Sequence, residues 1–165
     1  MIAKRLLFGD RRTIAGTVYG TIIVMSIVAA GAKHYEQMLW RLVVLTAVSA
    51  IVLWLAHVYA RGLGESLKLG HRLTLGEVTA VARRERSIVL AAVAPVAAVA
   101  LGGLNLVSQR AAIALALGVG VVTLAVKGVR YARLERLSFM GGVVTVTLNL
   151  AIGPMIVAAE LFIAH

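Results

Sequence analysis

The 165-residue sequence contains no cysteine and only one aspartate, Asp10. Without cysteine, the chain has no disulfides, thiolate metal sites or iron–sulfur clusters. A single aspartate cannot form the carboxylate cluster that holds magnesium for phosphoryl transfer. The Walker loop, HExxH and GxSxG patterns are also missing. The sequence therefore predicts that the protein is not an enzyme and uses no cofactor.

Charged residues are scarce as well, at 15% of the chain, whereas hydrophobic residues make up 61%. The mean hydropathy is +0.94. A soluble domain usually contains about 45–50% apolar and about 25% charged residues. Here the charges are bunched and separated by long uncharged tracts, a pattern typical of a polytopic membrane protein.

Five tracts contain no Asp, Glu, Lys or Arg, and all but the fourth have the length that crosses a bilayer, which is about 20 residues with a range of ~17–25. The fourth is short, but the Lys127 side chain can reach the headgroups, so this helix can continue to the interface. We predict an all-α fold: a polytopic membrane helix bundle with five transmembrane helices, forming a single domain over 1–165. The predicted spans are 13–32, 42–60, 87–107, 111–130 and 138–163.

Positive charge is distributed unevenly among the predicted loops. The chain has 17 Lys and Arg against 7 Asp and Glu. If the N-terminus is cytoplasmic, only Lys33, Arg41 and Arg110 lie outside, as the positive-inside rule predicts. We therefore expect a multi-pass protein of the inner (plasma) membrane with its C-terminus outside. The net charge of +10 is explained by anionic lipid headgroups as partners and requires no nucleic acid.

The first tract could also be read as a signal peptide, because basic residues precede it and Ala30-Gly31-Ala32 is an acceptable cleavage pattern. Its 20 residues exceed the apolar region of a signal peptide, which is usually ~7–15 residues long. Gly16 and Gly20 within it are also suited to helix contact. We therefore interpret this tract as a span.

The predicted inner loop, 61–86, contains the largest group of positive residues. Thr74 and Glu77 have the spacing of a capping box, which predicts a helix from Leu75 running unbroken into the third span. Arg83, Arg84 and Arg86 lie on this segment and are predicted to face lipid headgroups. The alternative is that they form a specific site for an acidic lipid or a partner protein.

Small residues form stripes on several predicted spans. Helices in lipid associate through close packing and polar contacts, so such stripes are expected to face other helices. Thr46 and Thr145 can return their hydroxyls to the preceding turn of their own helix. The fourth span carries Ala112, Ala116 and Gly120 on one face. The predicted helix-packing glycines are Gly16, Gly20, Gly120, Gly142 and Gly153.

A few polar residues lie within or at the ends of the apolar tracts. Asn149, near mid-membrane, is expected to bond across helices, either as structural support or in a polar pathway. His57 lies near the inner interface, where it either bonds to a carbonyl or headgroup or titrates in a vestibule. Glu160 lies near the outer interface, as an ordinary ion pair or a functional carboxylate. The candidate pathway residues are Tyr19, His57, Thr145, Asn149 and Glu160.

Two sets of residues resemble known membrane proteins. Val18-Tyr19-Gly20-Thr21, followed by segment 54–60, resembles small integral membrane proteins of actinobacterial type, mainly over the first two predicted helices. That resemblance implies no function. The spacing of Trp54 and His57, with Arg12 and Val18-Tyr19, also resembles bacterial relatives of the lysosomal potassium channel family, which implies a cation pore. The Phe-Ser-Asp motif of that family is missing here.

Two functions are consistent with these patterns. The first is an oligomeric channel or transporter for an ion or small solute, because five spans seldom enclose a large pathway alone. The second is a non-catalytic accessory or scaffold subunit of a larger membrane complex. Both imply a homo-oligomer or a partner membrane subunit, and they differ in whether His57, Asn149 and Glu160 line water.

Overall fold

The computed structural model describes residues 11–34 and 38–135, together with 140, 141, 143, 144, 147, 148, 151 and 155. Regular secondary structure in this part of the chain is entirely helical, which confirms the predicted all-α class there. The helices of the continuous segments are α2 (Arg11–His34), α3 (Leu39–Leu69), α4 (Leu75–Glu85), α5 (Ser87–Gly103) and α6 (Gln109–Leu134).

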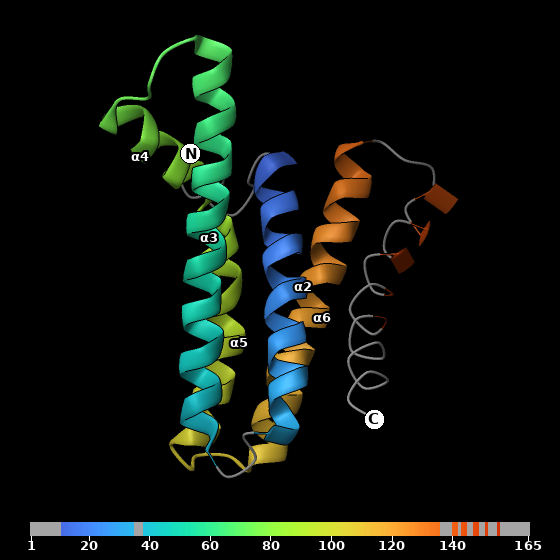
Figure 1. Cartoon of the computed structure of the whole chain (residues 1–165). Coiled ribbons are helices and arrows are strands. Elements are labelled where there is room, and N and C mark those ends of the chain that lie inside the picture. Colours follow the sequence, from blue (N-terminus) through green and yellow to red (C-terminus); the bar gives the residue numbers. More distant parts are fainter. Residues whose placement is uncertain are drawn as a thin grey trace, which may run out of the picture.

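Four long helices lie side by side and alternate in direction along the chain, while the short α4 lies beside the upper end of α3 (Figure 1). Helices α2 and α5 contact each other, and each of them also contacts α3 and α6. The α2–α5 pair is therefore the centre of the bundle, with α3 on one side and α6 on the other.

Apolar side chains fill the centre of this bundle. Val28, Leu42 and Val99 are fully buried, and they belong to one cluster with Val24 and smaller residues of α3, α5 and α6. The hydroxyls of these helices mostly bond within their own helix. The Thr46 hydroxyl donates to the Leu42 carbonyl at 2.7 Å, which confirms the prediction for this threonine. The described interior is thus packed and mainly apolar.

Glycines allow the closest helix approaches. A Cβ at Gly20 would lie 2.7 Å from the backbone oxygen of Ile88 in α5. A Cβ at Gly16 would meet the Ser87 hydroxyl, and one at Gly120 of α6 would meet the sulfur of Met25 in α2. Gly16 and Gly20 therefore lie where α2 crosses α5, and Gly120 lies where α6 meets α2.

Three described helices are long and apolar enough to cross a membrane: α3, α6 and the segment Thr13–Ala32 of α2. This segment has the bounds of the first predicted span. Helices α4 and α5 together pass the same test as one bent pair, which would make four spans. The fifth predicted span, 138–163, falls mostly outside the described residues.

The connection between α4 and α5 corrects one prediction. A helix does begin at Leu75, but it does not run unbroken into the next span, because it ends at Glu85 and α5 starts at Ser87 with a bend of 45°. Helix α4 packs mainly against α3, whereas α5 packs against α2, α3 and α6. The chain changes direction at Arg86 because the two segments have different packing partners. Helix α5 also ends at Gly103, before the predicted 107.

Candidate functional site at the basic end

The basic end of the bundle is the end formed by the start of α2, the second half of α3, α4, the start of α5 and the end of α6. Helix α3 continues here to Leu69, beyond the predicted limit at residue 60. It ends at Gly70, whose φ of +71° is left-handed and whose N–H donates to the Ser66 carbonyl at 3.0 Å. This is a favourable end for a helix because glycine has no side chain to oppose that conformation.

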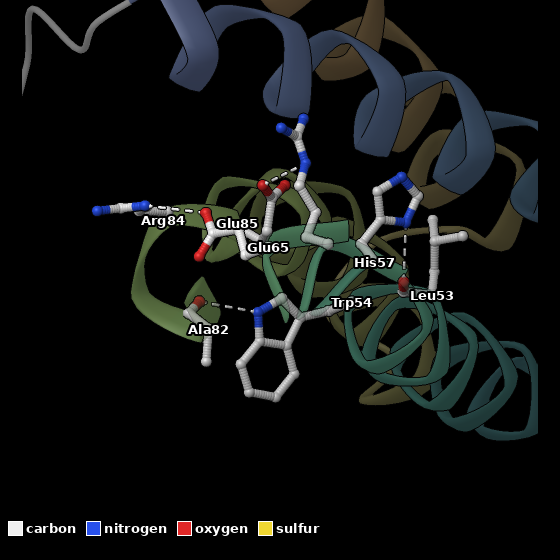
Figure 2. A network of polar contacts seen from close by, with 8 residues as sticks. Leu53, Trp54, His57, Glu65, Ala82, Arg84 and Glu85 are labelled. Carbon is white, nitrogen blue, oxygen red and sulfur yellow. Dashed lines mark hydrogen bonds and ion pairs between the residues drawn. The ribbon is translucent and has the colours of Figure 1, made fainter. Parts of the chain in front are cut away.

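Two ion pairs join the extension of α3 to α4 (Figure 2). Arg61 Nε lies 3.0 Å from Glu85 Oε1, and Arg84 Nη1 lies 3.2 Å from Glu65 Oε1. The Glu85 side chain is only 13% exposed, whereas the Arg61 side chain is 55% exposed. Each helix supplies one cation and one carboxylate, so the four charges balance and hold α4 in one register against α3.

Trp54 adds a hydrogen bond to the same interface. Its indole Nε1–H donates to the Ala82 carbonyl at 3.1 Å, from α3 to the last turn of α4 (Figure 2). Carbonyls in the last turn of a helix lack the N–H partners that a continuing helix would provide. The Trp54 indole therefore satisfies an acceptor close to the bend, and it stabilises the end of α4 at this position.

His57 lies one turn further along α3 and contacts α2. Its Nδ1 lies 3.1 Å from the Leu53 carbonyl, a hydrogen bond in which a protonated Nδ1 is the donor. The rings of His57 and Tyr19 are 4.9 Å apart between centroids, with their planes tilted by 50°. The structure thus brings together Tyr19 of α2 and His57 of α3, two of the candidate pathway residues.

The other residues predicted to belong to a site differ in where the structure places them. Arg84 pairs with Glu65, and Arg83 Nε donates to the Thr79 carbonyl at 3.3 Å, so both are held by the protein itself. Arg86 is exposed at the bend. The remaining candidates lie outside the described residues: Gly142, Thr145, Asn149, Gly153 and Glu160.

Thr74 and Glu77 form the capping box that their spacing predicts. The Thr74 N–H donates to Glu77 Oε2 at 2.7 Å, and the Glu77 N–H donates to the Thr74 hydroxyl at 3.4 Å. Glu77 Oε2 also accepts a hydrogen bond from the Thr74 hydroxyl at 2.9 Å. The bonds from the Thr74 N–H and hydroxyl to this oxygen lower the pKa of the Glu77 carboxyl from its ordinary value of 4.5, because they favour the ionised form. Glu77 is therefore ionised at neutral pH, and the start of α4 is set by local sequence.

Sequence reasoning missed the α3–α4 interface. Arg61 and Glu65 are four residues apart on one helical face, which is a signal for a shared partner surface. Arg61 and Glu65 share this face only if the helix continues past residue 60, where the apolar tract ends. Glu65 and Glu85, which pair with arginines here, both lie within the segment 61–86 that the sequence predicts as the inner loop.

The basic end offers ion pairing, hydrogen bonding and aromatic contact. Within 11–34, 38–135 and the described positions beyond them, no group of three or more His, Asp or Glu is placed to hold a metal ion. The resemblances noted above rest on short residue patterns only. No family model, curated protein or solved structure matches this chain.

Proposed function

We propose that this chain is a multi-pass integral membrane protein whose basic end lies on the cytoplasmic side. Three helices have the length and apolar character of spans. The alternating direction of the helices places Arg41, at the start of α3, and Arg110, at the start of α6, at one end of the bundle. The other arginines of α3, α4 and α6 lie at the opposite end. The positive-inside rule assigns the arginine-rich end to the cytoplasm.

Cysteine labelling tests this orientation on a background without native cysteine. Leu67, 84% exposed, lies at the basic end, and Leu106, 66% exposed, lies in the loop at the opposite end. In intact cells, a membrane-impermeant thiol reagent should label Leu106→Cys, and it should label Leu67→Cys only after permeabilisation. Labelling of both variants in intact cells, or of Leu67→Cys alone, would contradict the proposal.

Within the membrane, we infer that the protein serves as a non-catalytic scaffold or accessory subunit. The packed interior of α2, α3, α5 and α6 is the observation that carries this inference. Val24, Val28, Leu42 and Val99 fill the centre of the described bundle at 0–1% exposure. Large apolar side chains on the outward faces, such as Val52 and Val122, are available to lipid or to a partner subunit.

Transport by an oligomeric channel or transporter is the second candidate, and the Tyr19–His57 contact favours it. An imidazole and a phenol hydroxyl both form hydrogen bonds, so a route that passes this contact would have polar groups from two helices along it. Such a route would have to run outside the packed centre of the described bundle. Asn149 and Glu160 are the other residues that the sequence suggests for such a route.

Flux through liposomes distinguishes the two candidates. We expect the purified wild type to give no proton or monovalent-cation flux above that of protein-free liposomes between pH 5 and 8. His57→Ala should then reduce only stability, through loss of the Tyr19 contact. Flux in the wild type that His57→Ala, Asn149→Leu and Glu160→Gln each alter, in variants that remain folded, would overturn the scaffold inference and support transport.

A further inference from the structure

A groove of about 400 Å³ lies between the second half of α3 and the segment that leads into α4. Its walls are mainly apolar and include several exposed side chains. Ser66 and Arg72 also line it, and Arg72 is the one cation among its lining residues. The apolar lining residues are Leu55, Val58, Tyr59, Leu63, Leu73 and Val78.

Local hydrogen bonds hold the segment that forms one side of this groove. The Ser66 hydroxyl donates to the His71 carbonyl at 2.7 Å, and His71 Nδ1 lies 2.9 Å from the Arg72 carbonyl. Gly62 also lines the groove, and a Cβ there would lie 3.5 Å from Leu73 Cδ1. The groove is therefore a feature of ordered backbone, and the missing side chain of Gly62 leaves space within it.

Arg72 differs from Arg61, Arg83 and Arg84 because no described residue pairs with its charge; Arg86 shares this property but does not line the groove. Arg61 and Arg84 pair with carboxylates, and Arg83 bonds to a backbone carbonyl. Arg72 is exposed, and in the described residues its guanidinium has no hydrogen bond or ion pair. An arginine in this state is suited to bind a phosphate group with two parallel hydrogen bonds.

The groove also extends across the predicted edge of the membrane. Leu55, Val58 and Tyr59 fall within the predicted span 42–60, whereas Ser66 and Arg72 lie beyond it. At 1.5 Å per residue, Leu55 lies about 7 Å inside the predicted edge at residue 60, and Ser66 lies about 9 Å beyond it. On the membrane placement proposed above, Leu55, Val58 and Tyr59 are at acyl-chain depth and Arg72 is at headgroup depth.

We propose that this groove binds one anionic phospholipid, with an acyl chain along the apolar walls and the phosphate at Arg72. The proposal rests on the membrane location and orientation proposed above. It assigns recognition of the lipid to Arg72 and to the shape of the groove. Of the three arginines that the sequence suggested for this role, Arg83 and Arg84 are engaged by other groups, and Arg86 is exposed at the bend and does not line the groove.

Lipid binding to the purified protein in detergent micelles tests the charge requirement. The probes are phosphatidylglycerol and phosphatidylcholine with identical acyl chains, and native mass spectrometry counts the bound lipids. Arg72→Gln should weaken phosphatidylglycerol binding about fivefold, as expected for one arginine near an anionic lipid surface. The matched control Lys68→Gln removes an exposed cation that does not line the groove and should change binding less than twofold. Equal losses in both variants would indicate non-specific attraction and overturn the proposal.

A second pair of variants tests the groove itself without changing charge. Gly62→Phe should fill the space and reduce phosphatidylglycerol binding at least fivefold, while Gly62→Ala, which makes only ordinary contact with Leu73, should retain it. Gly64→Phe is the control, because nothing lies within 4 Å of a Cβ at that position. Circular dichroism verifies that each variant is folded.

Two further outcomes would also contradict the proposal. Competition by inorganic phosphate would show that Arg72 forms an anion site without an acyl chain, and equal binding of phosphatidylcholine would show an apolar site without charge selection. These measurements in micelles report neither sidedness nor flux. A failure here is therefore distinguishable from a failure of the proposed orientation or scaffold role.

Discussion

Replacing Gly20 with leucine is expected to prevent α2 and α5 from packing as they do in the wild type. A Cβ at Gly20 would lie 2.7 Å from the Ile88 oxygen and 3.1 Å from the Ile88 Cα. Both are backbone atoms, so no side-chain rotation relieves the contact and α5 itself must move. Overpacking typically destabilises a protein by ~1–3 kcal/mol. We expect Gly20→Ala to fall in this range and Gly20→Leu to exceed it.

Gly118→Ala in α6 is the matched control for this substitution. No atom lies within 4 Å of a Cβ at Gly118, which is also an exposed helical position. Alanine is favoured over glycine in a helix by about 0.5–1 kcal/mol, so this variant should be as stable as the wild type or more stable. Unfolding by dodecyl sulfate in mixed micelles, followed by circular dichroism, measures both. A Gly20→Ala variant as stable as Gly118→Ala would show that α2 and α5 do not approach at Gly20.

Replacing Leu42 with alanine should have the second large effect. Leu42 is fully buried in the central cluster, with Val28 and Val99. In a membrane, moving a leucine side chain from lipid into the protein interior gains little free energy, because lipid is equally apolar. The destabilisation by Leu42→Ala therefore arises from lost dispersion contacts and from the cavity left behind. Leucine-to-alanine changes in packed cores reduce the free energy of unfolding by ~2–5 kcal/mol, and we expect the lower part of this range.

Leu45→Ala provides the comparison on the same helix. Leu45 is 41% exposed and lies less than one turn from Leu42, so the two substitutions remove the same atoms at a similar depth. We expect Leu45→Ala to change the free energy of unfolding by less than ~1 kcal/mol, as for a side chain outside the packed core. If the two variants unfold alike in the same dodecyl sulfate titration, α3 does not present its Leu42 face to the bundle.

Several parts of the fold were predictable because they depend on residues close in sequence. The capping box of Thr74 and Glu77 placed the start of α4 at Leu75, and the structure begins the helix there. The apolar tract 13–32 also matches the segment of α2 that is long enough to span a membrane. The buried residues Ala112, Ala116 and Gly120 of α6 recur every four positions, so the helical period alone placed them on one face.

The candidate site was predictable only in part. The similar depth of Tyr19 and His57 suggested that they could meet, and their rings do lie together. The bonds around them join residues that are distant in sequence: Trp54 contacts Ala82 at a separation of 28 residues, and Glu65 contacts Arg84 at 19. No local pattern selects such partners, because they depend on the angle at which α4 meets α3.

By itself, the sequence determined the helical class, the apolar segments, the uneven placement of positive charge and the start of α4. Each of these follows from composition, helical period or hydrogen bonds within one turn. Only the tertiary structure decided that α3 extends to Leu69, that the chain bends at Arg86, and that Arg61 and Arg84 pair with carboxylates while Arg72 does not. The physical reason is that these features depend on contacts between helices, and their geometry is set when the whole bundle packs.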